Sequence, residues 1–211
     1  MPARRPVTVL LVRHGLTATT GTVLPGRAPG LHLSEAGRSE AEAAAARIGA
    51  LGGVRAVYAS PLERAAETAA PIARATGRRV RTVEGLNECD FGAWTGRKLA
   101  ELRRLAAWRQ VQHTPSAFRF PGGESFAEMQ TRICDTLGQL AARHRGGAIV
   151  AVSHADPIKA AVAQAVGTPL DLFQRLVVSP CSVTVIAYGG DGPVVLTVNS
   201  TGDDLRTLRP G

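Results

Sequence analysis

Cysteine is scarce in this chain, and its three cysteines stand far apart. Cys89, Cys134 and Cys181 are odd in number and include no Cys-x-x-Cys pair, which argues against a disulfide framework. We therefore expect reduced thiols and a cytoplasmic protein.

Long apolar runs are also missing. No run approaches the roughly 18–20 residues that a helix needs to cross a bilayer. The apolar stretch that follows Arg4 and Arg5 is too short for a secretory signal and leads directly into a polar motif. The sequence therefore predicts neither a membrane partner nor a signal peptide.

Lysine and aromatic residues are the other scarce classes. Lys98 and Lys159 are the only lysines, and aromatic residues make up 4% of the chain, although the formal net charge is +8. Proteins that bind nucleic acid combine clustered cations with aromatic side chains on which bases stack. Here the arginines are spread along the whole chain, so no nucleic-acid partner is expected. A basic surface still attracts small phosphorylated molecules.

What the chain does contain is an alternation of short apolar runs and helical stretches. The strand-like runs cover 7–12, 54–59 and 148–153, and the helical stretches cover about 35–51, 62–76, 124–145 and 157–166. This alternation predicts a layered α/β domain with a largely parallel sheet.

The 211 residues suit one domain, 1–211, with a loop-rich insert at about 86–123 over the site. A hairpin at about 183–198 is expected to close one edge of the sheet, where two copies can pair as a homodimer.

Two strand-like runs end on a histidine. Arg13-His14-Gly15 follows the first run, and Ser153-His154 follows the run at 148–152. Open α/β folds bind ligands beyond the carboxyl ends of their parallel strands. We therefore expect these residues to meet at one edge of the sheet, with Gly15 allowing a sharp turn and close approach to a ligand.

Helix starts supply further candidates. Ser60, Pro61 and Glu63 match the N-cap, N1 and N3 positions of a capping box, which places Arg64 in the first helical turn. Asp156 and Pro157 match the N-cap and N1 of a later helix. A helix N-terminus attracts anions, and a guanidinium adds a bidentate phosphate ligand.

Two arginines and two histidines that converge in this way would form a pocket for a phosphate monoester. A neutral imidazole can attack phosphorus while the arginines hold the equatorial oxygens, and a protonated second histidine can stabilise the transition state. The leaving oxygen needs a proton, which Glu88 can supply if burial raises its pKa. Asp90 is the alternative acid. This chemistry requires neither a metal nor another cofactor.

The same residues carry a family resemblance. The matching stretches are LVRHG (11–15), LSEAGRSEA (33–41), YASPLERAAETA (58–69), LNECDFGAWTG (86–96), PGGESFAEM (121–129) and VSHADPIKAAV (152–162). In these stretches the chain resembles the histidine phosphatase superfamily, on its small phosphatase branch. The resemblance implies a phosphoglycerate mutase-like fold, a three-layer α/β/α sandwich around a mostly parallel sheet.

The resemblance also implies roles for single residues. His14 becomes the phosphorylated nucleophile, and Glu88, four residues before Gly92, becomes the general acid. The implied phosphate-binding residues are Arg13, Thr17, Thr20, Arg64, His154 and Ala155. Thr20 stands where many members of the family carry asparagine.

Three functions compete. The first is a metal-independent phosphomonoesterase that hydrolyses a small phosphorylated metabolite through a phosphohistidine at His14. The second is a mutase that returns the phosphoryl group to another hydroxyl of the same substrate, and the third is a module that only binds phosphorylated ligands. The chain length favours hydrolysis, because glycolytic mutases of this fold usually carry a longer insertion. His32, Glu124 and Ser125 are candidates for the pocket rim.

Overall fold

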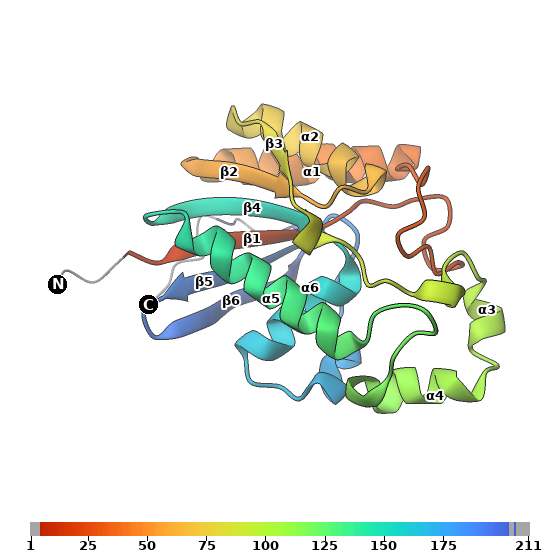
Figure 1. The fold of residues 1–211 in the computed structure, drawn as a ribbon. Helices are drawn as coiled ribbons and strands as arrows, with labels where there is room; N and C mark the ends of the chain where they lie inside the picture. Colours follow the sequence, from red (N-terminus) through yellow and green to blue (C-terminus); the bar gives the residue numbers. More distant parts are fainter. Residues whose placement is uncertain (1–4, 203–204, 206–211) are drawn as a thin grey trace.

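The computed structural model describes residues 5–202 and 205, and these contain a six-stranded sheet in the order β3-β2-β4-β1-β5-β6 (Figure 1). The strands are β1 (Val7–Arg13), β2 (Val54–Ala59), β3 (Val80–Thr82), β4 (Gly147–Ser153), β5 (Val183–Gly189) and β6 (Gly192–Ser200). Strands β3, β2, β4 and β1 are parallel, whereas β5 pairs antiparallel with β1 and β6 pairs antiparallel with β5. The mostly parallel sheet and its closing hairpin are thus confirmed. Strand β3 was not predicted, because it has only three residues.

Four long helices sandwich this sheet. They are α1 (Glu35–Leu51), α2 (Glu63–Thr76), α5 (Phe126–Ala142) and α6 (Ala155–Ala165). Helices α1 and α2 cover one face, and α5 and α6 cover the other (Figure 1). This arrangement confirms the three-layer sandwich.

The β1 strand shows why the layers form. Val9 and Leu11 pack into the core under α5 and α6, whereas Leu10 and Val12 pack into the core under α1 and α2. Because successive side chains of a strand point to opposite faces, a strand covered on both faces must be apolar throughout. The apolar run before Arg13 is therefore the mark of a central strand.

The helix starts agree only partly with the predictions. Ser34 caps α1 as its side chain accepts a hydrogen bond from the Gly37 N–H. The capping box expected at Ser60 is wrong, because Leu62 is the N-cap of α2 and makes no side-chain cap. Asp156 is likewise not an N-cap: α6 begins at Ala155, with His154 as its N-cap.

The helix predicted at about 124–145 is shorter than expected and ends at Ala142. Helix α5 starts at Phe126 rather than 124, and Ser125 forms a capping box with Glu128. At Ser60 the reason for the wrong prediction is that a serine near a helix start can bond to distant partners, here His154 and Asn87, instead of capping its own helix.

Residues 86–123 include two short helices and cover the region beyond the strand ends (Figure 1). The helices are α3 (Leu99–Leu102) and α4 (Ala106–His113), and the 3-10 turns η2 (Gly92–Trp94) and η3 (Pro115–Ala117) flank them. A cluster of aromatic rings holds this segment to the body of the protein. It consists of Phe91, Trp94, Phe118, Phe120 and Phe126.

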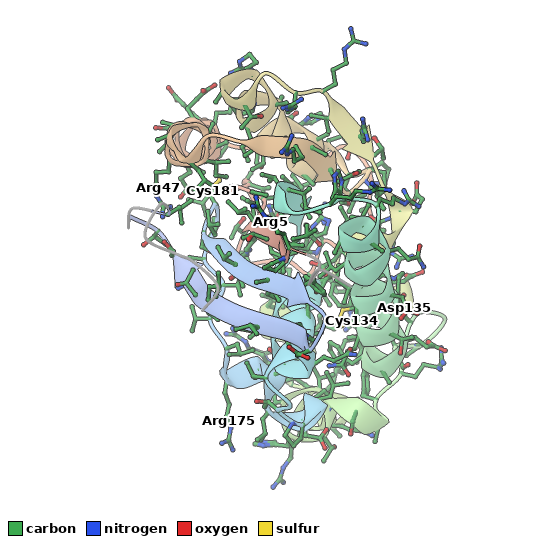
Figure 2. All side chains as sticks on the ribbon, turned by 90° about the vertical axis from the view of Figure 1, so that its left-hand side faces the viewer. Arg5, Arg47, Cys134, Asp135, Arg175 and Cys181 are labelled. Atoms are coloured by element: carbon green, nitrogen blue, oxygen red, sulfur yellow. The ribbon has the colours of Figure 1, made fainter. Side chains whose placement is uncertain are left out.

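The three cysteines are free thiols on different elements. Cys134 lies on α5, and Cys181 lies near α1 on the other side of the sheet (Figure 2). Over residues 5–202 and 205, no helix is both long enough and apolar enough to span a bilayer.

Candidate active site

The two histidines meet beyond the carboxyl ends of β1 and β4. These strands are parallel neighbours with Arg13 opposite Ser153, so the next residues, His14 and His154, emerge side by side. Their ring centroids are 5.2 Å apart, and both side chains are buried. The prediction that two strands deliver a pair of histidines to one site is confirmed by this geometry.

His14 is held as a neutral imidazole by burial and by a hydrogen bond at Nδ1. Its Nδ1 lies 2.8 Å from the Gly15 carbonyl oxygen, which can only accept, so Nδ1 carries the proton. Burial and the positive charges of Arg64 and Arg13 lower the pKa of His14 to about 3. At neutral pH the Nε2 lone pair is therefore available as a nucleophile.

Two arginines surround this pair with unused donors. Arg64 is fully buried, and its side chain donates one hydrogen bond, from Nη2 to the Gly26 carbonyl at 2.8 Å. Arg13 donates from Nη1 to the Val178 carbonyl at 2.7 Å. Among the described residues, Arg13 Nε and Arg64 Nε and Nη1 find no acceptor. Buried unpaired donors are costly, and an anion would satisfy them.

His154 is oriented by Ser60, which is in turn held by Asn87. Its Nε2 lies 2.9 Å from Ser60 Oγ, and Ser60 donates its proton to Asn87 Oδ1 at 3.1 Å. Ser60 must therefore accept from His154 Nε2, and Nδ1 of His154 is left without a partner in the described part of the chain. Burial and the charge of Arg64 lower the pKa of His154 well below its usual range. Ser60 thus serves this site rather than capping α2.

Glu88 is the candidate proton donor. Its Oε1 accepts a hydrogen bond from the Cys89 N–H at 2.9 Å, and the side chain is buried. Burial and the nearby Asp156 carboxylate raise the pKa of Glu88 to about 7, although Arg64 and Arg13 act in the opposite direction. A carboxyl group with this pKa can act both as an acid and as a base at neutral pH.

Asp90, the alternative acid, is placed differently. Its side chain is 42% exposed, and Oδ1 accepts a hydrogen bond from the Gly92 N–H at 3.0 Å. Its other oxygen lies 3.9 Å from Arg27. This geometry favours Glu88, because Asp90 caps a turn and faces solvent.

Gly15 is required by packing rather than by a special backbone conformation. A Cβ on Gly15 would lie 2.6 Å from the Gly37 carbonyl oxygen of α1, so α1 fits only against a glycine. The Gly15 N–H donates to Thr68 Oγ1 at 3.0 Å, and Thr68 donates to the Arg64 carbonyl. The observed close approach is to α1, and the expected close approach of Gly15 to a ligand stays a prediction.

The other predicted residues have defined positions. Thr17 and Thr20 contact each other through their hydroxyl oxygens at 2.9 Å, and Thr20 Oγ1 also accepts from the Thr17 N–H. Ala155 is the first residue of α6, next to His154. Of the rim candidates, His32 pairs with Glu67 at 2.5 Å. The phosphate-binding roles of these residues stay predictions.

Glu88 is supported by a network of polar side chains that was not predicted from the sequence. Arg27 and Arg132 both donate to the Glu88 carbonyl oxygen, and both form ion pairs with Glu124. Glu124 was a candidate for substrate contact at the rim, but both of its oxygens are engaged by these arginines. The only local signal was the PGGES stretch, which does not reveal where Arg27 or Arg132 will lie.

Known proteins resemble this chain over nearly its full length. A family model described as the histidine phosphatase superfamily (branch 1) matches residues 9–201. A bifunctional protein of Mycobacterium tuberculosis is 34% identical over 210 residues, which cover 93% of this chain and 55% of that protein. The chain thus spans about half the length of this relative.

Two phosphoserine phosphatases match this chain over more than nine tenths of each protein. Phosphoserine phosphatase 1 of Hydrogenobacter thermophilus is 30% identical over 200 residues, covering 92% of this chain and 93% of the relative. The solved structure of the Entamoeba histolytica phosphoserine phosphatase with phosphoserine has a TM-score of 0.83 and 26% identity, covering 92% and 98%. The expected family and fold are confirmed, and the chain belongs to the histidine phosphatase superfamily.

Proposed function

We propose that this protein hydrolyses small phosphomonoesters without a metal, through a phosphohistidine intermediate on His14. The observation that carries this proposal is the set of unpaired donors around His14. Arg13 Nε and Arg64 Nε and Nη1 lack acceptors in the described part of the chain, and His154 Nδ1, which carries a lone pair while its Nε2 donates to Ser60, has no partner there either. A phosphoryl group bound between them would accept these hydrogen bonds, and the arginines would neutralise its charge.

In the first step His14 Nε2 attacks phosphorus. The N–P bond forms as the P–O bond to the alcohol breaks, and the electron pair moves to the ester oxygen. Glu88 gives this oxygen its proton, so a neutral alcohol leaves. The Gly15 carbonyl keeps the proton on His14 Nδ1 and thereby directs the Nε2 lone pair to the substrate.

In the second step water resolves the intermediate. The Glu88 carboxylate takes a proton from water, the water oxygen attacks phosphorus, and the N–P bond breaks to release phosphate. Glu88 and His14 return to their starting states. The pKa of about 7 suits Glu88 to both roles, because the acid and base forms are similarly populated at neutral pH. The negative charge of the bound phosphoryl group would favour protonation of His154 Nδ1, and the resulting imidazolium would stabilise the charge that develops on the phosphoryl oxygens.

The non-phosphate part of the substrate remains the open question. A cavity of about 330 Å³ lies where the insert meets α6, with Trp108 and Arg103 on the insert side and Asp156 and Lys159 on α6. We propose that this region selects the alcohol portion of the substrate. Phosphoserine is the first compound to test, because two similar proteins are phosphoserine phosphatases.

The test is phosphate release from a panel of phosphomonoesters in the presence of EDTA. The panel holds phosphoserine, a sugar phosphate and a nucleoside monophosphate, beside an assay for interconversion of 3- and 2-phosphoglycerate. Release that survives chelation supports the proposal, whereas interconversion without release supports the mutase. The absence of both phosphate release and interconversion supports a module that only binds phosphorylated ligands.

The His14→Ala variant tests the intermediate. It should keep its fold and lose all but about 1% of the turnover, because removal of the covalent route costs several kcal/mol. His113→Ala is the matched control, since His113 is exposed at the end of α4. Higher residual activity would remove His14 from the nucleophilic role.

We further propose that the protein is cytoplasmic and that residues 1–211 form one domain. We also propose that two copies pair along β6. Free thiols support the location, and the single sheet supports one domain. Strand β6 is an edge of the sheet, and its Val194 is 55% exposed. Light scattering coupled to size exclusion would measure the mass, and a monomer at all concentrations would exclude the pairing.

A further inference from the structure

The turn that carries Glu88 is held by an arginine from a distant helix. Arg132 of α5 donates from Nη1 to the carbonyl oxygens of Gly85 and Asn87, both at 2.9 Å. Its Nη2 donates to the Glu88 carbonyl at 3.2 Å. One side chain therefore binds three backbone carbonyls immediately before and at the proposed acid. The partners of Arg132 are these carbonyls and the Glu124 carboxylate, and none of them is the Glu88 carboxyl group.

Glu124 holds Arg132 in this position. Its two oxygens lie 2.7 Å from Arg132 Nε and 2.9 Å from Nη2, which is a bidentate ion pair. Glu124 Oε2 also accepts from the Asp90 N–H at 3.1 Å and from Arg27 Nη2 at 2.9 Å. The same carboxylate thus binds the backbone just after Glu88 and fixes the arginine that binds the backbone before it.

The network is largely shielded from solvent. The side chains of Arg132 and Glu124 are 22% and 16% exposed. Burial acts to raise the pKa of Glu124, but the hydrogen bonds and positive charge of Arg132 outweigh it, so the pKa lies below its usual value. Glu124 is therefore ionised, and its pairing with Arg132 is stronger than an exposed surface pair.

Arg27 extends the network to the phosphate side. Its Nε donates to the Glu88 carbonyl at 2.8 Å. The preceding residue, Gly26, accepts the hydrogen bond from the buried Arg64. The backbone position of the acid is thus linked through one loop to the position of a phosphate-binding arginine.

We propose that Arg132 and Glu124 are positioning residues that aim the Glu88 carboxyl group at the leaving oxygen. The proposal rests on the acid role proposed for Glu88. A general acid works only within hydrogen-bond distance of the oxygen it protonates. A displacement of about 1 Å can cost a factor of about 10² in rate. Release of three carbonyls permits such a displacement without removing any group that touches the substrate.

The test uses two substrates that differ in their need for a proton. An alkyl phosphate such as phosphoserine needs the acid, whereas p-nitrophenyl phosphate releases a stable phenolate without it. The measured quantity is kcat/KM, because it reports the steps up to release of the alcohol and excludes hydrolysis of the intermediate. In Arg132→Met we expect kcat/KM to fall by about 10² for the alkyl ester and by less than about 3 for the aryl ester.

Glu88→Gln supplies the reference. It should show the same selective loss, and adding Arg132→Met to it should cause no further selective loss, because the acid is already absent. Arg74→Met is the matched control. Arg74 lies in the last turn of α2 and forms an exposed ion pair with Glu42. This control should keep kcat/KM for both substrates.

The outcomes separate the two proposals. Equal losses on both substrates in Arg132→Met would mean a merely structural role and would overturn the positioning proposal. If Glu88→Gln lacks the selective loss, the acid assignment itself is wrong. If Arg132→Met does not fold, Glu124→Gln and Arg132→Lys take its place. Both should show the selective loss, because neither keeps the bidentate pair.

Discussion

Arg64 is a buried cation whose charge no carboxylate balances through a direct ion pair in the described part of the chain. We predict that Arg64→Met makes the ligand-free protein more stable while nearly abolishing catalysis. Arg64 is fully buried with one hydrogen bond, and two of its nitrogens are unpaired. A methionine of similar length removes the desolvation cost of the charge and keeps the packing.

The magnitudes follow from these contacts. Replacing a buried charge by an apolar side chain is neutral or stabilises a fold by about 1–4 kcal/mol. The lost bond to the Gly26 carbonyl costs about 1 kcal/mol. The net expectation is a gain of about 0–3 kcal/mol, and each kcal/mol raises Tm by about 2–4 °C in a chain of this size.

Catalysis should change in the opposite direction. Each charge-assisted hydrogen bond from Arg64 to the phosphoryl group is worth about 1.5–3 kcal/mol. Loss of two such bonds predicts a fall in kcat/KM of about 10²–10⁴. The stabilisation that inorganic phosphate gives the wild type should also disappear, since ligand binding stabilises a fold by mass action.

The assay is urea unfolding with and without inorganic phosphate, together with kcat/KM on one substrate. Arg74→Met on the same helix is the control, because Arg74 is exposed in an ion pair with Glu42, and its stability should change by less than about 0.5 kcal/mol. A fall of more than about 2 kcal/mol in the free energy of unfolding of ligand-free Arg64→Met would contradict the prediction. Stabilisation of the variant by inorganic phosphate to the same extent as the wild type would contradict it as well.

Three further predictions concern the same site and its surroundings. With a pKa of about 7, Glu88 loses its proton above neutral pH, so kcat/KM for an alkyl phosphate should fall about tenfold per pH unit there; a pH profile of Glu88→Gln should lack this fall. Phe120→Ala removes a buried ring from the aromatic cluster and should cost about 3–5 kcal/mol in urea unfolding, and a loss under about 1.5 kcal/mol would contradict the packing. Thr68→Val leaves the buried Gly15 N–H without its acceptor and should cost about 1–3 kcal/mol of stability together with a lower kcat/KM, so unchanged values for both would show that this bond is dispensable.

Local patterns account for much of the architecture. The alternation of apolar strands and helical stretches predicts the sandwich, because the spacing of apolar residues along the chain shows which stretches form strands and which form helices. The pair of histidines was predictable for a related reason. Each follows an apolar run directly, and parallel strands bring their carboxyl ends to one edge of the sheet.

Errors arose where a polar residue had two possible partners. Ser60 matched an N-cap by sequence, but in the fold it bonds to His154 and Asn87. A local capping bond and a distant side-chain bond use the same hydroxyl, and only the packed structure decides between them.

The sequence by itself determined the layers of this protein, its central strands and the two residues, His14 and His154, that end them. Only the tertiary structure decided which of the many arginines support the site. Arg132 binds carbonyls more than forty positions away in the chain, and Arg27 reaches the Glu88 carbonyl from another loop. The physical reason is that such contacts depend on the packing of whole elements, which no short stretch of sequence encodes.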